Sequence, residues 1–183
     1  MTAAASTHPR SRLRVRLVLA GLSACGLAAL AWTAFVQPLP RLVYNPSDSV
    51  PVGWYRTGPT DALHVGAIVL TTLPPDVAAL AAQRRYLPAR VPLLKRVGAM
   101  APQHVCIFDA LVWIDGVPVA AVLPADRLDR PLPSWPHCRR LEAGELFLLS
   151  SSNPASFDSR YFGPVSASAV IGVAHPLWLE SRP

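Results

Sequence analysis

Lysine is used once in this chain, and its position suggests chemistry. Of the 17 Lys and Arg residues, Lys95 is the sole lysine, within the apolar run Val-Pro-Leu-Leu-Lys-Arg-Val. Arginine stays protonated in proteins, whereas a lysine desolvated by apolar neighbours can have its pKa lowered by several units from about 10.4. A neutral lysine amine can take the proton of a serine nucleophile without a histidine. The alternative is a lysine whose charged end reaches solvent at a strand edge.

A serine-containing turn supplies the candidate nucleophile. Residues 44–55 read Tyr-Asn-Pro-Ser-Asp-Ser-Val-Pro-Val-Gly-Trp-Tyr. Ser47 and Ser49 flank an aspartate ahead of a proline and a glycine, which is typical of a turn that could expose a hydroxyl at a strand end. Taken without Lys95, an ordinary structural turn would be the better interpretation.

A second serine-rich segment lies near the C-terminus. Residues 150–163 read Ser-Ser-Ser-Asn-Pro-Ala-Ser-Phe-Asp-Ser-Arg-Tyr-Phe-Gly. Asp158 and Arg160 could pair and order a loop whose serines, including Ser156, point inward. The alternative is a solvated loop with no role in chemistry.

Together these segments resemble the conjugative-transfer signal peptidases, the TraF-type branch of the type I signal peptidase serine family. The first matches the pattern N-x-[ST]-x-S-x-P-x-G-x-[YW], and the Lys-Arg-Val and Ser-Phe-Asp-Ser-Arg-Tyr-Phe-Gly segments match the later boxes in family order. The resemblance covers essentially the whole chain.

Three departures from the housekeeping leader peptidases favour the conjugative branch. Ser49-Val50-Pro51 replaces their Ser-Met-x-Pro, and residues 100–103, Met-Ala-Pro-Gln, stand where they carry Pro-Gly-Asp. Ser151-Ser152-Asn153 replaces their Gly-Asp-Asn.

The resemblance implies a serine endopeptidase that acts by acyl transfer, with Ser49 as nucleophile and Lys95 as general base. Ser47 and the backbone N–H of Ser49 would form the oxyanion hole. The supporting residues would be Ser156, which orients the lysine amine, and the pair Asp158 and Arg160. No cofactor and no metal are expected. The implied partner is a membrane-bound precursor such as a pilin, released by hydrolysis or by cyclisation.

The N-terminal region predicts a membrane anchor. Residues 17–36 contain no charge and are long enough as a helix to span roughly 30 Å of hydrocarbon. Arginines 10, 12, 14 and 16 precede this run without any acidic residue, so the positive-inside rule puts the N-terminus in the cytoplasm. We therefore expect a cytoplasmic basic stub at 1–16, a transmembrane helix at 17–36 and an extracytoplasmic peptidase domain at 37–183. In a bacterium this means a single-pass inner-membrane protein with a periplasmic catalytic domain.

A cleaved secretory signal is the alternative to this anchor. Such signals have a shorter apolar region and end in small residues. Trp32 and Phe35 stand where those small residues would be needed. The short connection from Val36 to Ser49 keeps the candidate site near the bilayer, where Trp54 and Tyr55 could rest at the interface or pack in the core.

Charge and cysteine content restrict the class of protein further. Four of the 17 basic residues lie in the stub, which leaves 13 against 11 acidic residues and gives no reason to expect a nucleic-acid partner. Cys106 and Cys138 fall in the exported region, where a disulfide is possible, with two unpaired thiols as the alternative. Cys25 lies in the apolar segment, and no zinc-site spacing occurs.

The exported region reads as one mainly β domain with a signal-peptidase/LexA-like fold, the fold that the resemblance implies. Short Val-, Ile- and Leu-rich segments bounded by turn residues predict strands. They span 41–45, 67–72, 91–97, 105–108, 111–114, 117–122, 146–150 and 170–174. Asp115-Gly116 predicts a hairpin, Pro75 to Tyr86 predicts one short helix, and 124–137 reads as an irregular excursion.

Three alternative functions remain open on sequence alone. A general type I signal peptidase would use the same residues, whereas an anchored β scaffold of a secretion complex would use its serine turns only structurally. A His-dependent hydrolase lacks support, because no Gly-x-Ser-x-Gly elbow occurs and His8 falls in the stub. The remaining histidines, none beside an evident partner motif, are His64, His104, His137 and His175.

The first prediction concerns the two central residues. Ser49→Ala removes the nucleophile, and Lys95→Arg replaces the base with a group that stays protonated. Each variant should insert normally and abolish processing of an exported precursor, measured as precursor and product in isolated membranes. Full activity of Lys95→Arg membranes would exclude the dyad.

Overall fold

The structure is a computed structural model that describes residues 9–36, 41–150 and 152–180. It divides into two units, residues 1–39 and 40–183, each of which is described by itself. His8, half of the predicted stub and Ser151 lie outside the described residues, as does the side chain of Phe35.

The first unit is the helix α1 (Pro9–Val36), which starts within the predicted stub and runs through the predicted membrane segment. Its stretch Arg12–Trp32 is long and apolar enough to cross a membrane, and every side chain described there is exposed. A helix that is apolar all round and unburied by protein is suited to lipid as its surroundings.

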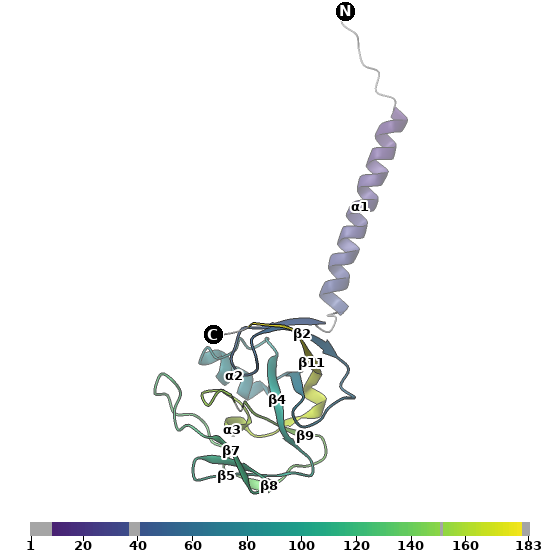
Figure 1. The fold of residues 1–183 in the computed structure, drawn as a ribbon. Helices are drawn as coiled ribbons and strands as arrows, with labels where there is room; N and C mark the ends of the chain where they lie inside the picture. The colour runs from purple at the N-terminus through teal and green to yellow at the C-terminus, as the bar shows by residue number, and fades with distance from the viewer. Residues whose placement is uncertain (1–8, 37–40, 151, 181–183) are drawn as a thin grey trace, which may run out of the picture. The chain divides into compact units, whose positions relative to one another are not determined.

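The second unit is built on two antiparallel sheets (Figure 1). The seven-stranded sheet has the order β1-β2-β11-β3-β4-β9-β10, and the four-stranded sheet has the order β7-β6-β5-β8. The strands of the larger sheet are β1 (Leu42–Asn45), β2 (Gly53–Gly58), β3 (Ile68–Thr71), β4 (Leu93–Met100), β9 (Glu145–Leu148), β10 (Val165–Ser166) and β11 (Val170–Leu179). Those of the smaller sheet are β5 (His104–Phe108), β6 (Leu111–Ile114), β7 (Val117–Ala121) and β8 (Cys138–Arg140).

All eight predicted strands occur, with ends shifted by a few residues, but β2, β8 and β10 were not predicted. Strand β2 alternates buried and exposed positions, yet the exposed Trp54 hides that alternation in the sequence. Gly53, at its start, has φ of 146°, and a Cβ there would meet the backbone of Trp178 and Leu179. Glycine is therefore needed where β2 and β11 approach each other closely.

Two helices of the second unit differ from the sequence prediction. Helix α2 (Pro75–Gln83) begins with the predicted proline but ends three residues before Tyr86, because Arg85 takes a left-handed φ of 61°. The predicted end of this helix at Tyr86 was therefore wrong, and Arg84 and Arg85 follow the helix instead of forming its last turn. Helix α3 (Ser159–Phe162) forms in the segment read as a loop, and the Asp158 carboxylate caps it by accepting from the Arg160 backbone N–H.

A short 3₁₀ helix, η1 (Ala167–Ala169), leads into β11. The predicted hairpin at Asp115-Gly116 joins β6 and β7, with φ of 50° and 82° at the two turn residues. Positive φ at both central positions is the requirement of a type I′ turn.

One part of the core lies beneath the turn that carries Ser49, and another lies between the two sheets. Val50 and Tyr55 belong to the first cluster, which Ile68, Leu70, Leu94 and Ala174 complete. Tyr55 is fully buried and donates its hydroxyl to the Pro51 carbonyl, so of the two options for this residue the membrane interface was wrong. Phe147 anchors the second cluster together with Ala99, Val105, Val112, Ile114, Leu141 and Leu149.

Phe147 gives the stability prediction for this fold. Phe147→Ala should lower the free energy of unfolding by about 3–5 kcal/mol, because it opens a cavity between the two sheets. Phe108→Ala is the matched control, since Phe108 is half exposed, and should cost less than about 1 kcal/mol. Urea unfolding of the detergent-solubilised chain measures both, and equal losses would contradict the packing described.

Candidate active site

The turn that carries Ser49 is organised by Asn45, the last residue of β1. The Asn45 amide, 4% exposed, donates to the carbonyls of Ser47 and Val50 at 2.7 and 3.0 Å and to that of Pro51 at 3.1 Å. Its side-chain oxygen accepts from the Ser47 backbone N–H and hydroxyl. Asn45 thus satisfies backbone groups on both sides of Ser49, and this fixes where the Ser49 hydroxyl points.

The position of Lys95 is set by β4, whose Lys95 pairs with Val69 of β3. Only 1% of Lys95 is exposed, and its Nζ lies 2.6 Å from Ser49 Oγ, a residue 46 positions away in the chain. The same amine contacts the hydroxyl of Ser156, which is also buried. The structure therefore brings together three side chains from the three segments singled out in the sequence.

Burial controls the protonation of Lys95. It lowers the pKa of the amine to about 8, while the Asp158 carboxylate raises that pKa and the Arg160 guanidinium lowers it. The neighbouring charges act in opposite directions, so the lost hydration of the ammonium is the main cause. The amine consequently titrates near physiological pH.

The second serine-rich segment is held by a buried ion pair. Asp158 and Arg160 are both 0% exposed and meet at 2.7 Å. The Asp158 carboxylate also accepts the Ser150 N–H, and the Arg160 guanidinium donates to the carbonyl oxygens of Ala121, Ser150, Asn153, Pro154 and Ser156. These bonds satisfy both ions and fix the backbone around Ser156.

Ser47 lies beside Ser49, and its hydroxyl already makes a hydrogen bond. Its Oγ donates to Asn45 Oδ1 at 2.8 Å and lies 3.5 Å from Ser49 Oγ. A serine hydroxyl has a single proton. To donate a hydrogen bond to an oxyanion, the Ser47 hydroxyl would therefore have to turn its proton away from Asn45.

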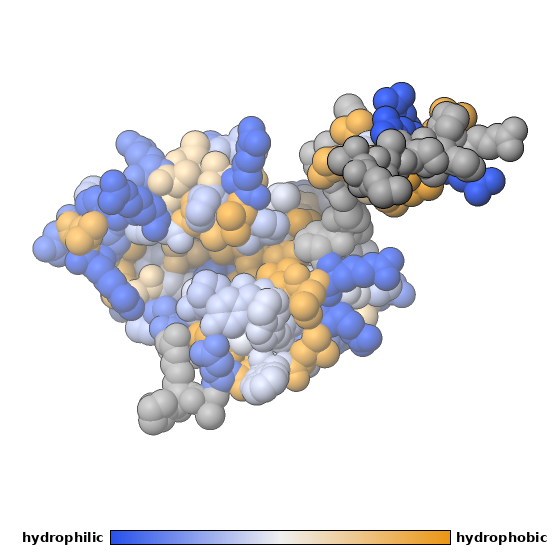
Figure 2. All heavy atoms as spheres, turned by 90° about the horizontal axis from the view of Figure 1, so that it is seen from above, coloured by the Kyte–Doolittle hydropathy of each residue, from blue (hydrophilic) through white to orange (hydrophobic). Residues whose placement is uncertain are grey.

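A cleft of about 1220 Å³ is lined by Asn45, Ser47, Ser49, Lys95 and Ser156, among other residues. Figure 2 looks onto a face where apolar residues line a hollow bordered by hydrophilic side chains. The turn that carries Ser49, β4 and the loop around Ser156 form part of the lining, and the segments after α2 and around Asp126 form another part. None of the described histidines lines this cleft, which removes support from a His-dependent hydrolase.

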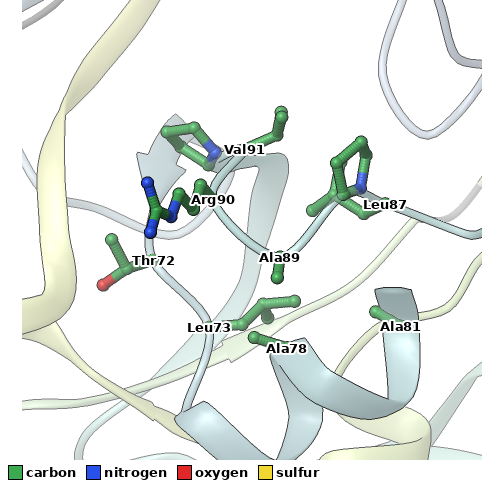
Figure 3. Close-up of a pocket in the computed structure, with 10 residues that line it drawn as sticks. Thr72, Leu73, Ala78, Ala81, Leu87, Ala89, Arg90 and Val91 are labelled. Carbon is green, nitrogen blue, oxygen red and sulfur yellow. The ribbon is translucent and has the colours of Figure 1, made fainter. Parts of the chain in front are cut away.

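A smaller pocket of about 100 Å³ adjoins the cleft between α2 and the segment 87–92 (Figure 3). Ala78 and Ala81 of α2 point toward Leu87 and Ala89 across it, and Ala81 and Leu87 line the cleft as well. The pocket extends the apolar part of the cleft away from Ser49.

The two cysteines of the second unit lie in the smaller sheet. Cys106 of β5 and Cys138 of β8 stand opposite each other and form a disulfide. His104 Nδ1 lies 3.4 Å from the Cys106 sulfur, and the three residues make a compact His-Cys-Cys group. Both sulfurs are used by the disulfide, so this group offers no thiolate ligands to a metal.

Sequence reasoning missed two contributors to the site. Asn45 stood in the matched pattern without a role, and its signal was an asparagine directly before the proline of a serine turn. Ser159 accepts the Leu148 backbone N–H through its hydroxyl at 2.9 Å and links α3 to β9. No sequence pattern pointed to that bond.

Comparison with known proteins shows the family of this chain. Residues 14–179 match the family described as signal peptidase, peptidase S26. A plasmid transfer protein TraF of Escherichia coli is 32% identical over 177 residues, covering 91% of this chain and 95% of that protein. A probable conjugal transfer protein TraF of Sinorhizobium fredii is 31% identical over 176 residues, covering 89% and 90%. The chain belongs to the signal peptidase family S26, as a TraF-type member.

One solved structure was also matched. The signal peptidase I of Enterococcus faecalis is 22% identical, with a TM-score of 0.38, and the match covers 62% of this chain and 97% of that one. The strands of the second unit and the family match of residues 14–179 confirm the predicted mainly β signal-peptidase fold, preceded by an apolar N-terminal helix.

Burial of Lys95 predicts a pH-dependent stability. The folded pKa of about 8 lies below the ordinary value of 10.5, so the unfolded chain binds the proton more tightly and stability rises as pH increases between these values. Relative to Lys95→Met, the wild-type free energy of unfolding should rise by about 3 kcal/mol from pH 7 to pH 10.5. Leu94→Met keeps the lysine and should retain the wild-type slope. Urea titrations at each pH measure the free energies of unfolding. If the difference between wild type and Lys95→Met did not vary with pH, the buried amine would be contradicted.

Proposed function

We propose that this protein is a membrane-anchored serine endopeptidase in which Ser49 is the nucleophile and Lys95 the general base. The observation that carries the proposal is the 2.6 Å contact between Lys95 Nζ and Ser49 Oγ, made by an amine that is 1% exposed. General-base catalysis needs this distance and a pKa near the working pH. With a pKa of about 8, roughly a quarter of the amines are neutral at pH 7.5.

The proposed reaction proceeds by acyl transfer. Neutral Lys95 takes the Ser49 proton as Oγ bonds to the scissile carbonyl carbon, and the resulting ammonium returns the proton to the leaving amine as the C–N bond breaks. The Ser49 N–H and the Ser47 hydroxyl, turned from Asn45, stabilise the oxyanion by on the order of 3 kcal/mol per donor. Ser156 holds the amine in line with Ser49. Lys95 then activates the nucleophile that releases the acyl group.

The released product depends on which nucleophile attacks the ester. Water gives a linear chain with a free carboxylate. The amine at the substrate's own N-terminus gives a cyclic or transpeptidated chain through a new amide bond. An open cleft of about 1220 Å³ is large enough to admit a second chain segment beside the acyl group.

The proposed substrate is a membrane-bound precursor of conjugal transfer, such as a pilin. The names of the relatives, plasmid and conjugal transfer proteins, support this choice over a general signal peptidase. The arginines before the apolar helix favour a cytoplasmic N-terminus, an inner-membrane anchor and a periplasmic peptidase domain. Trp54 and Trp178, 44% and 76% exposed on β2 and β11, are residue types that suit a lipid interface near such a substrate.

The test is co-expression with candidate pilin precursors, followed by mass spectrometry of intact products. Wild type should convert a precursor that accumulates uncleaved with Ser49→Ala. A linear product is heavier by one water than the corresponding ring, so the mass also assigns the final step.

A non-catalytic scaffold is the alternative that this experiment must exclude. Labelling with a serine-directed acylating probe should modify Ser49 of the wild type and leave Lys95→Arg unmodified. Absence of both labelling and processing would overturn the proposed activity.

A further inference from the structure

Two loops on the wall of the cleft are locked to each other. The Asp126 carboxylate accepts from the Tyr86 hydroxyl and pairs with Arg130 at 2.7 Å. The Arg130 guanidinium lies 5.5 Å from the centre of the Tyr86 ring and donates to the Arg84 carbonyl. The segment after α2 and the loop 125–130 therefore form one wall, although 40 residues separate Tyr86 from Asp126.

This wall has more arginines than carboxylates to pair with them. Four arginines line the cleft there: Arg84, Arg85, Arg127 and Arg130. The wall has two acidic residues, Asp126 and Asp129. Asp126 pairs with Arg130, which with Tyr86 holds the pKa of that carboxyl well below its usual range. Asp129 is exposed and does not line the cleft, so the four arginines there face a single carboxylate. Within the described part of the chain, Arg85 and Arg127 are exposed and have no salt-bridge partner.

The backbone beneath these two arginines is fixed before any ligand arrives. Arg85 holds a left-handed φ of 61°, which costs a non-glycine residue on the order of 1 kcal/mol. The bonds from Arg85 N to Ala82 O and from Tyr86 N to Ala81 O impose that conformation. Arg127 lies inside a turn in which Asp126 accepts the Leu128 and Arg130 N–H groups. A preorganised site loses less entropy when a ligand binds.

We propose that Arg85 and Arg127 form a subsite that binds an acidic side chain of the peptide substrate. This inference rests on the proposed function and adds the substrate class of the same cleft. A guanidinium binds a carboxylate through paired N–H groups, which a neutral amide cannot match. Because both arginines are exposed, the gain is modest and weakens with salt.

The test uses full-length protein in detergent and a decapeptide of alanine and glycine. In one series a single glutamate occupies each position in turn, and in a second series glutamine takes its place. When the substituted position is the one that reaches the subsite, or its neighbour, the wild-type KM for the glutamate peptide should be three- to tenfold lower than the KM for the matching glutamine peptide. The kcat should be little changed. The ratio of the glutamine KM to the glutamate KM should fall to about one in the double variant Arg85→Gln/Arg127→Gln. Arg140→Gln, an exposed arginine outside the cleft, should keep the wild-type ratio.

Binding to Ser49→Ala, measured by fluorescence anisotropy on the same peptides, separates this inference from the proposed activity. A glutamate preference that disappears with the double substitution supports the subsite even if cleavage fails, whereas failed cleavage alone counts against the peptidase. Equal binding of both series would overturn the subsite. Binding of the double variant to vesicles of anionic lipid is measured in parallel. Loss of vesicle binding with unchanged peptide binding would also overturn the subsite, because the arginines would then bind lipid headgroups.

Discussion

The buried amine of Lys95 is the contact on which the rest of the site depends. An ammonium in this position loses its hydration, and among the residues that the structure describes it gains two hydroxyl contacts, from Ser49 and Ser156. That imbalance is what brings the lysine pKa down to about 8. The surrounding fold must therefore keep water out and hold both hydroxyls in place, because either failure would restore an ordinary surface lysine.

Three separate devices meet that requirement. Strand β4, paired on both sides within the larger sheet, excludes water from the lysine. Asn45 fixes the Ser49 turn by bonding backbone groups around it, and the Asp158–Arg160 pair fixes the loop that carries Ser156. The last device places a second cation and an anion beside the amine, with opposing effects on its pKa. A paired ion can thus order the loop without forcing the lysine into one charge state.

The lining of the cleft has an apolar part and a basic part. Near Ser49 it is floored by apolar side chains of the sheet, such as Leu70 and Leu94, and it extends toward the small pocket beside α2. On the wall formed by the segment after α2 and the loop 125–130, the contacts of Asp126 with Arg130 and Tyr86 hold the basic residues in place. The excursion 124–137 looked irregular in the sequence, yet a few polar contacts order its first part, which contributes Arg127 and Arg130 to the charge of the cleft.

Local sequence patterns were enough to predict most of the secondary structure of this protein. Short β-rich segments and an Asp-Gly turn predicted eight strands and a hairpin, and twenty uncharged residues predicted the apolar helix. A single lysine among arginines singled out Lys95. Only the tertiary structure decided what depends on contacts between distant segments. Strand β2 exists because β1 and β11 pair with it, and α3 because Asp158 caps it. The approach of Lys95 to Ser49 across 46 residues, and the charge left unpaired on Arg85 and Arg127, follow from sheet register and loop packing, which no single segment encodes.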